Sequence, residues 1–152
     1  MSMKFFIVAR HPNDSSEELS TGQAENLVGG IRSFLREKGI DSLPSVAVFA
    51  STARRADPVV NALSLAFTRV FVIRDGVYTH DSTHRFKQVM QFLVGQFEFD
   101  VVIVIAHLPT MLEMLSFGAE LCGYGDAINL LSGDYARANV LDCRTGESFL
   151  LE

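Results

Sequence analysis

Four places along this chain carry polar side chains at the end of an apolar run or within five residues after it. They are Arg10 with His11, Arg55, Asp75 and His107. A guanidinium presents paired N–H donors that match the oxygens of a phosphate group, and an imidazole can act as a nucleophile or as a further donor. None of these residues is specific alone, but the set predicts a site for phosphoryl chemistry.

The apolar runs before these residues predict strands that are buried on both faces, because they are rich in bulky and β-branched side chains. They cover residues 5–9, 46–50, 70–73 and 101–106, and the last run is the most apolar. In an open parallel sheet, ligands bind beyond the carboxyl ends of the strands. If the four strands lie parallel in one sheet, we expect the polar residues that follow them to converge at one edge.

Helical patterns alternate with these runs. A first helix is indicated by apolar positions such as Leu27 and Leu35, after a polar loop over residues 13–21. The Gly29-Gly30 pair in this segment weakens a helix, and close packing of the helix against the sheet is one reason for the pair to occur.

Three further segments complete the pattern. Asp57-Pro58 has the form of a helix start, Ser82 is a candidate cap for the next helix, and Pro109 suits the start of another. Residues 138–151 read as a final hairpin. Strands that alternate with helices predict a three-layer α/β/α sandwich with a mostly parallel central sheet and antiparallel pairing at its end. We expect a single domain over residues 1–152.

Composition narrows the class of protein. The 152 residues are 48% hydrophobic and 20% charged, which is typical of a folded domain. The net charge of −5 argues against a nucleic-acid surface, although it permits a small basic pocket. No segment has the length of a membrane span, and the first apolar run is too short for the core of a signal peptide, so we expect a cytoplasmic protein without a membrane partner.

The cysteines and the remaining histidines show no metal-ligand spacing. Cys122 and Cys143 have neither zinc-site nor redox-motif spacing, and we expect them to be reduced structural thiols. His80 and His84 lack the neighbours that a zinc site needs. The sequence therefore predicts no metal and no cofactor.

The polar stretches resemble the motifs of the histidine phosphatase superfamily, also called phosphoglycerate-mutase-like. That family has Arg-His-Gly after the first strand, Ser-x-x-x-Arg-Ala after the second, an acidic residue in a Leu-x-Glu context, and Gly-His or Ser-His after a later strand. This chain has Arg10-His11-Pro12, the stretch 51–56 (STARRA), the stretch 73–75 (IRD) and the stretch 106–109 (AHLP), in the same order. Residues 19–24 also look like the family's Leu-Thr-x-x-Gly-x-x-Gln-Ala stretch in a shortened form. In its short length and in the His-Leu-Pro after the fourth strand, the chain is most similar to the small phosphohistidine phosphatases of the SixA type.

The resemblance implies a phosphatase that needs no metal and forms a phosphohistidine. His11 would attack phosphorus, and Arg10, Arg55 and His107 would hold the phosphoryl oxygens. Asp75 is the match for the family's general acid. The implied partner is a phosphorylated protein, with phosphohistidine preferred, or else a small phosphomonoester.

Departures from the family pattern keep alternatives open. Pro12 stands where the family has glycine, which motivates a second hypothesis of a degenerate member that binds a phosphorylated partner or an anion without turnover. Either Arg54 or Arg55 could face the site, and Arg55 is preferred because Ala56 follows it. Asp75 beside a glycine could instead be a surface turn residue. A phosphoglycerate mutase ranks only third among the hypotheses, because that reaction needs more structure to enclose the substrate than we expect in this chain.

Overall fold

The computed structural model of the chain describes residues 3–13, 16–40, 43–74, 80–124 and 130–151. Within these ranges, six strands are present: β1 (Phe5–Arg10), β2 (Ser45–Ala50), β3 (Arg69–Arg74), β4 (Val101–Ala106), β5 (Ala138–Asp142) and β6 (Ser148–Leu151). The α-helices of the same ranges are α1 (Glu17–Glu37), α2 (Asp57–Ala66), α3 (His80–Gln96) and α4 (Leu108–Leu121). A single 3₁₀ turn, Arg54–Ala56, comes before α2.

The strands form one mixed sheet in the order β3-β2-β4-β1-β5-β6. The first four in that order are parallel, whereas β5 pairs antiparallel with β1 and with β6. Arg10 stands opposite Ala106 at the ends of β1 and β4, and Ala50 stands opposite Arg74 at the ends of β2 and β3. The carboxyl ends of four strands therefore lie along one edge. Because β5 runs the other way, its first residues reach that same edge, where Ala138 pairs with Ala9.

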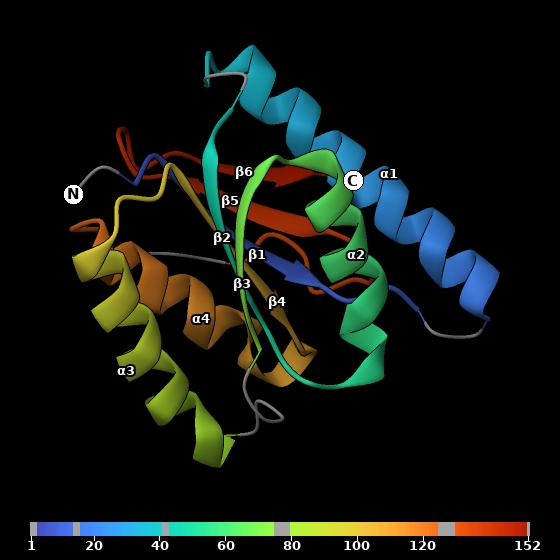
Figure 1. Cartoon of the computed structure of the whole chain (residues 1–152). Coiled ribbons are helices and arrows are strands. Elements are labelled where there is room, and N and C mark those ends of the chain that lie inside the picture. Colours follow the sequence, from blue (N-terminus) through green and yellow to red (C-terminus); the bar gives the residue numbers. More distant parts are fainter. Residues whose placement is uncertain (1–2, 14–15, 41–42, 75–79, 125–129, 152) are drawn as a thin grey trace.

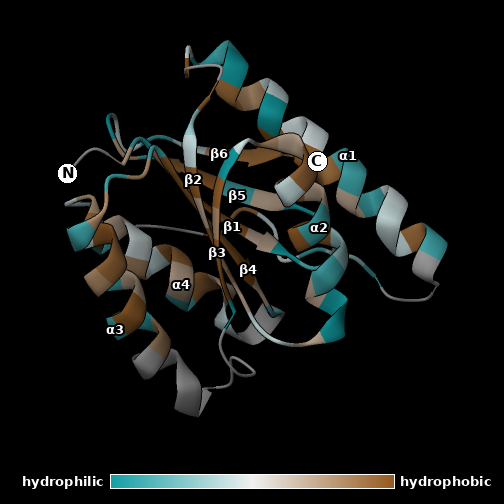
Figure 2. Cartoon of the chain, viewed as in Figure 1, coloured by the Kyte–Doolittle hydropathy of each residue, from teal (hydrophilic) through white to brown (hydrophobic). Residues whose placement is uncertain are grey.

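Helices cover both faces of the sheet, with α1 and α2 on one side and α3 and α4 on the other (Figure 1). The strands alternate their side chains between these two layers: Phe5 and Ile7 point into the core beneath α1 and α2, while Phe6 and Val8 point into the core beneath α3 and α4. Figure 2 shows the strands in the colours of hydrophobic residues, whereas α1 carries hydrophilic residues along much of its length. The predicted three-layer sandwich with a mostly parallel sheet is confirmed.

The first helix begins earlier than the sequence pattern predicted. Ser16 is its N-cap, and its hydroxyl accepts a hydrogen bond from the backbone N–H of Leu19 at 3.2 Å. The polar loop therefore ends near Ser16 instead of Thr21. The expectation that Gly29 and Gly30 permit close packing was wrong, because a Cβ on either residue would meet no atom within 4 Å.

The expectation of free thiols at Cys122 and Cys143 was also wrong. The structure joins them in a disulfide with a Cα–Cα distance of 5.4 Å. Cys122 caps the end of α4, and Cys143 directly follows β5. The spacing of 21 residues gave no signal, because the two ends meet only when α4 runs back along the sheet to the edge where β5 finishes.

Among the described residues, no helix is both long enough and apolar enough to cross a membrane.

Candidate active site

His11 lies directly after β1 and is only 5% exposed. Its Nδ1 lies 2.9 Å from the carbonyl oxygen of Pro12. Since a carbonyl oxygen can only accept, Nδ1 carries the proton of the neutral ring and Nε2 carries the lone pair. Pro12 stands where a glycine was expected, yet its carbonyl group is the one that orients the imidazole, and its missing N–H takes no part in this contact.

The loop that carries His11 is tied to the first turns of α1. Gln23 accepts a hydrogen bond from the backbone N–H of Asn13 at 3.0 Å, and the hydroxyl of Ser20 donates to the carbonyl of Asn13 at 2.8 Å. Both residues belong to the stretch 19–24 that the sequence analysis singled out. These contacts fix the chain two residues after His11, so the stretch has a supporting part in the site.

His107 directly follows the central strand β4, at the N-cap of α4, and lies beside His11. The two ring centroids are 5.3 Å apart and the rings are tilted by 58°. Both ring nitrogens of His107 are buried and have no hydrogen-bond partner among the described residues. Burial, followed by the nearby charges of Arg55, His11 and Arg10, lowers the pKa of His107 from 6.5 to about 4. The ring is therefore neutral at pH 7 and carries one N–H donor near the positive charges of Arg55 and Arg10.

Arg10 is held on two sides by the segment before β5. Its Nη1 donates to the carbonyl of Gly133 at 2.9 Å, and its Cζ lies 3.7 Å from the centre of the Tyr135 ring. The Tyr135 ring is also 5.7 Å from the His11 ring. The Nε of Arg10 is buried and, within the described part of the chain, has no partner. Gly133 and Tyr135 were not singled out in the sequence, which offers no motif around them.

Arg55 comes from the 3₁₀ turn that follows β2, and its charge acts on His107. Arg54 is not among the charges that shift the pKa of His107. Arg55 is thus the one of the two whose charge acts on His107, and its preference over Arg54 as a site residue stays a prediction. Both arginines border an open hollow of about 540 Å³ between the start of α1 and the start of α2.

The loop before Arg55 is braced by Arg74 at the end of β3. The guanidinium of Arg74 donates from Nε to the carbonyl of Ser51 at 2.9 Å and from Nη2 to the carbonyl of Ala53 at 3.1 Å. Its Nη1 also pairs with Asp57 at the first turn of α2. Sequence reasoning noted Arg74 only as part of the stretch before Asp75, whereas the structure gives it the task of holding the chain that carries Arg55.

Asp75 lies outside the described residues, so its role as general acid stays a prediction. The same holds for the contacts of the His80 and His84 side chains. Of the five predicted site residues, the structure brings Arg10, His11 and His107 together at the carboxyl ends of β1 and β4, with Arg55 near enough to shift the pKa of His107.

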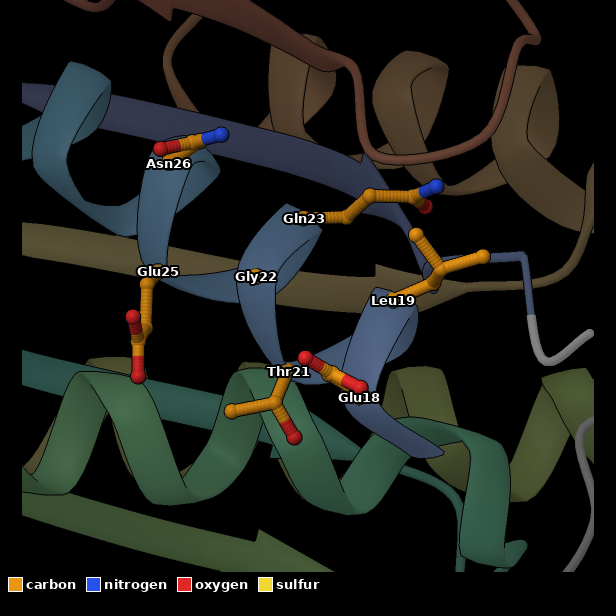
Figure 3. A pocket seen from close by; sticks show the side chains of 7 residues that line it. All are labelled: Glu18, Leu19, Thr21, Gly22, Gln23, Glu25 and Asn26. Carbon is orange, nitrogen blue, oxygen red and sulfur yellow. The ribbon is translucent and has the colours of Figure 1, made fainter. Parts of the chain in front are cut away.

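A wider hollow of about 900 Å³ runs along the first part of α1 (Figure 3). The residues that line it all belong to that helix: Glu18, Leu19, Thr21, Gly22, Gln23, Glu25 and Asn26. Its walls contain none of the predicted site residues and carry acidic side chains, which repel a phosphate group. We therefore assign the chemistry to the edge of the sheet and not to this larger surface feature.

Comparison of the sequence with family models and with curated proteins gives no match. Solved structures do match. Phosphoglycerate mutase from Plasmodium falciparum superposes with a TM-score of 0.62 at 18% identity, over 100% of this chain and 91% of that one. The chain has the phosphoglycerate-mutase-like fold.

Two SixA structures share this phosphoglycerate-mutase-like fold. SixA of Agrobacterium tumefaciens, assigned as a phosphohistidine phosphatase, gives a TM-score of 0.59 at 18% identity over 99% of this chain and 96% of that one. The protein histidine phosphatase SixA in complex with tungstate gives 0.59 at 15% identity, over 97% and 94%. The predicted fold class, including its similarity to SixA, is confirmed by these superpositions.

Proposed function

We propose that this chain is a metal-independent phosphatase that forms a phosphohistidine on His11, with protein phosphohistidine as its substrate. The observation that carries the proposal is the pairing of His11 with His107. The His11 ring is held with its lone pair on Nε2. The His107 ring, whose centroid is 5.3 Å from that of His11, has two buried nitrogens without a partner in the described part of the chain. Buried polar atoms without partners are costly, and a bound phosphoryl group would satisfy them.

The reaction runs in two displacements. In the first, the lone pair on Nε2 of His11 forms a bond to phosphorus while the bond from phosphorus to the substrate's imidazole nitrogen breaks, and the leaving imidazole takes up a proton. In the second, water attacks phosphorus, the bond between phosphorus and Nε2 breaks, and inorganic phosphate leaves with His11 restored.

The positive side chains around the histidines stabilise the transferring group. Arg10 and Arg55 supply charge and forked donors, and the N–H of His107 supplies a further hydrogen bond to a phosphoryl oxygen. These groups serve the purpose that a metal ion serves in other phosphatases, so we propose no metal and no cofactor.

The choice of phosphohistidine rests on the leaving group. An imidazole has a pKa near ~6.5 and leaves with little help, whereas an alkoxide needs a strong general acid. The described groups that shift the pKa of His107 are two arginines and His11, with no carboxyl group among them. We propose Asp75 for that role, with small phosphomonoesters as slower substrates that depend on it more.

The hypothesis of a binding module without turnover was motivated by Pro12. The hydrogen bond from His11 to the Pro12 carbonyl favours the enzyme instead, because it prepares the nucleophilic tautomer. No observation on the described residues favours the third hypothesis, a phosphoglycerate mutase. We propose the cytoplasm as the location, and the disulfide between Cys122 and Cys143 makes the redox state of the purified protein worth recording.

The test measures phosphate release from p-nitrophenyl phosphate and from a phosphohistidine peptide, with chelator present. We expect activity on both, a preference for the peptide, and loss of turnover in His11→Ala. Undiminished turnover in that variant, or inhibition by chelator, would exclude the mechanism. Binding of vanadate with no turnover of either substrate would favour the binding module.

Arg54 and Arg55 form a matched pair of controls. Removing a charged hydrogen bond costs about 1.5–3 kcal/mol, so Arg55→Ala should reduce kcat/KM roughly 10- to 100-fold. Arg54→Ala should change it by less than about threefold, because its charge is not among those that act on His107. Equal losses in the two variants would contradict the assignment of Arg55.

A further inference from the structure

The guanidinium of Arg10 is fixed by a segment that no sequence motif marks. We infer that Tyr135 is a positioning residue for the reaction: with the Gly133 carbonyl, it clamps Arg10 so that the Nε–Nη2 edge of the guanidinium faces the phosphoryl group. This inference rests on the function proposed above and names a further residue on which that function depends.

The contacts of Arg10 divide its five donors into two sets. Nη1 is already used, because it donates to the carbonyl of Gly133 at 2.9 Å. The side of the guanidinium opposite Nη1 carries the N–H groups of Nε and Nη2, which lie parallel and form the fork that fits two oxygens of one phosphate. Nε is buried with no partner in the described chain. A buried donor of this kind indicates the place that a ligand oxygen would fill.

Tyr135 prevents the guanidinium from rotating away from this orientation. Its ring centre lies 3.7 Å from the Cζ of Arg10, which is the distance of direct stacking. The ring also lies 5.7 Å from the ring of His11, so it touches both halves of the Arg10-His11 pair. Tyr135 remains 41% exposed, as expected for a residue at the mouth of a site.

The segment that presents Tyr135 is itself rigidly held. Asn139, which is 1% exposed in β5, accepts from the backbone N–H groups of Leu131 and Ser132 and donates to the carbonyl of Ser132. Ala136, the residue after Tyr135, has φ of 52°, a left-handed conformation that costs a residue with a Cβ about 1–2 kcal/mol. Strain of this kind persists only where the surroundings enforce it, and it is commonly found at functional sites.

The experiment uses three single variants of the full chain and inorganic phosphate as the probe. Tyr135→Leu removes the ring, Tyr135→Phe keeps it, and Tyr124→Leu makes the same change at a tyrosine beyond the far end of α4, about 20 Å from the start of that helix. We measure the dissociation constant of phosphate by calorimetry, together with kcat and KM on p-nitrophenyl phosphate. Thermal unfolding shows that each variant is folded.

We expect Tyr135→Leu to weaken phosphate binding and to lower kcat/KM about tenfold each, because stacking of a cation on a partly desolvated ring contributes on that scale. Tyr135→Phe should stay within about twofold of the native chain, because the ring face is retained. Tyr124→Leu should bind phosphate as the native chain does.

A double-mutant cycle with Arg10→Ala separates positioning from a general structural effect. If Tyr135 acts through Arg10, Tyr135→Leu should cause no further loss of phosphate binding once Arg10 is absent. An equal loss in both backgrounds, or failure of phenylalanine to substitute for tyrosine, would overturn the inference.

The outcomes also separate this inference from the proposed function. If the native chain binds phosphate with the predicted dependence on Tyr135 but releases no phosphate from either substrate, the proposed phosphatase activity is excluded. The positioning of Arg10 by Tyr135 is then still supported. Turnover that depends on His11 but is unchanged in Tyr135→Leu would support the phosphatase and overturn the clamp. A native chain that does not bind phosphate at all would overturn both.

Discussion

Protonation of His107 should make this protein less stable in mild acid. The pKa of His107 is about 4 in the folded chain, whereas the ordinary value for an unfolded chain is 6.5. As the pH falls below about 6.5, the unfolded chain binds a proton that the folded chain does not accept until about pH 4. The free energy of unfolding therefore falls as the pH decreases across this window. Above pH 6.5, His107 does not lower it.

The size of the effect follows from the two pKa values. Each unit of difference corresponds to about 1.4 kcal/mol, so the gap between 6.5 and about 4 gives about 3 kcal/mol as an upper bound. His107 is only partly buried, and water at the ring reduces this to about 2 kcal/mol. For a chain of ordinary stability, that is a large share of the total.

The assay compares urea unfolding of the native chain and of His107→Gln from about pH 7.5 to about pH 4.5. Glutamine retains a polar side chain of similar length but does not titrate. We expect the difference in unfolding free energy between the two proteins to shift by about 2 kcal/mol in favour of the variant as the pH falls. An NMR titration of the His107 ring should show a midpoint near 4.

Parallel stability curves for the two proteins, or a midpoint near 6.5, would refute the reasoning. Inorganic phosphate provides a further check. A bound anion favours the charged imidazole, so saturating phosphate should raise the midpoint of His107 and reduce the loss of stability in acid. No change on addition of phosphate would mean that the anion does not reach His107.

Three further predictions concern stability and the support of the site. Gly118→Ala should destabilise by about 1–3 kcal/mol in urea unfolding, because the new Cβ would overlap the ring of Phe6, while Gly30→Ala, with open space around it, should stabilise by up to about 1 kcal/mol. The same sign for both would contradict the packing described. Asn139→Ala should lose about 1–3 kcal/mol and also lower kcat/KM, since the segment before β5 loses three hydrogen bonds; unchanged activity in the folded variant would argue against that segment's part in the site. Reduction of the disulfide at the end of α4 should lower the free energy of unfolding by about 3 kcal/mol for its loop of 21 residues, and an unchanged midpoint in reductant would contradict this.

The sequence was sufficient for the parts of the site that follow parallel strands. Arg10 ends β1, and His11 and His107 come directly after β1 and β4, whose carboxyl ends meet at one edge because the strands are parallel. Arg55 follows β2 less directly, in the 3₁₀ turn Arg54–Ala56. Buried parallel strands have a strong apolar signal, so the residues after them can be placed without knowing any side-chain contact.

Other parts could not be predicted because they depend on contacts between distant residues. Gly133 is 123 residues from Arg10, and it reaches the site only because β5 is antiparallel and begins where β1 ends. The apolar pattern predicted the final hairpin, but it does not reveal that β5 pairs with β1. The disulfide was missed for the same reason, and the prediction of close packing at Gly29 was wrong because an exposed glycine has no distinct sequence pattern.

The position of β1 in the sheet has a consequence for how the molecule is made. This strand carries Arg10 and leads into His11, yet its two neighbours, β4 and β5, begin at Val101 and Ala138. During synthesis, β1 leaves the ribosome well before β4 and β5, so it cannot pair on either side until those strands have followed. His11 is thus synthesised long before the residues that surround it in the folded chain. A partly translated chain would lack the clamp on Arg10, and activity should appear only when residues 130–142 have left the ribosome tunnel.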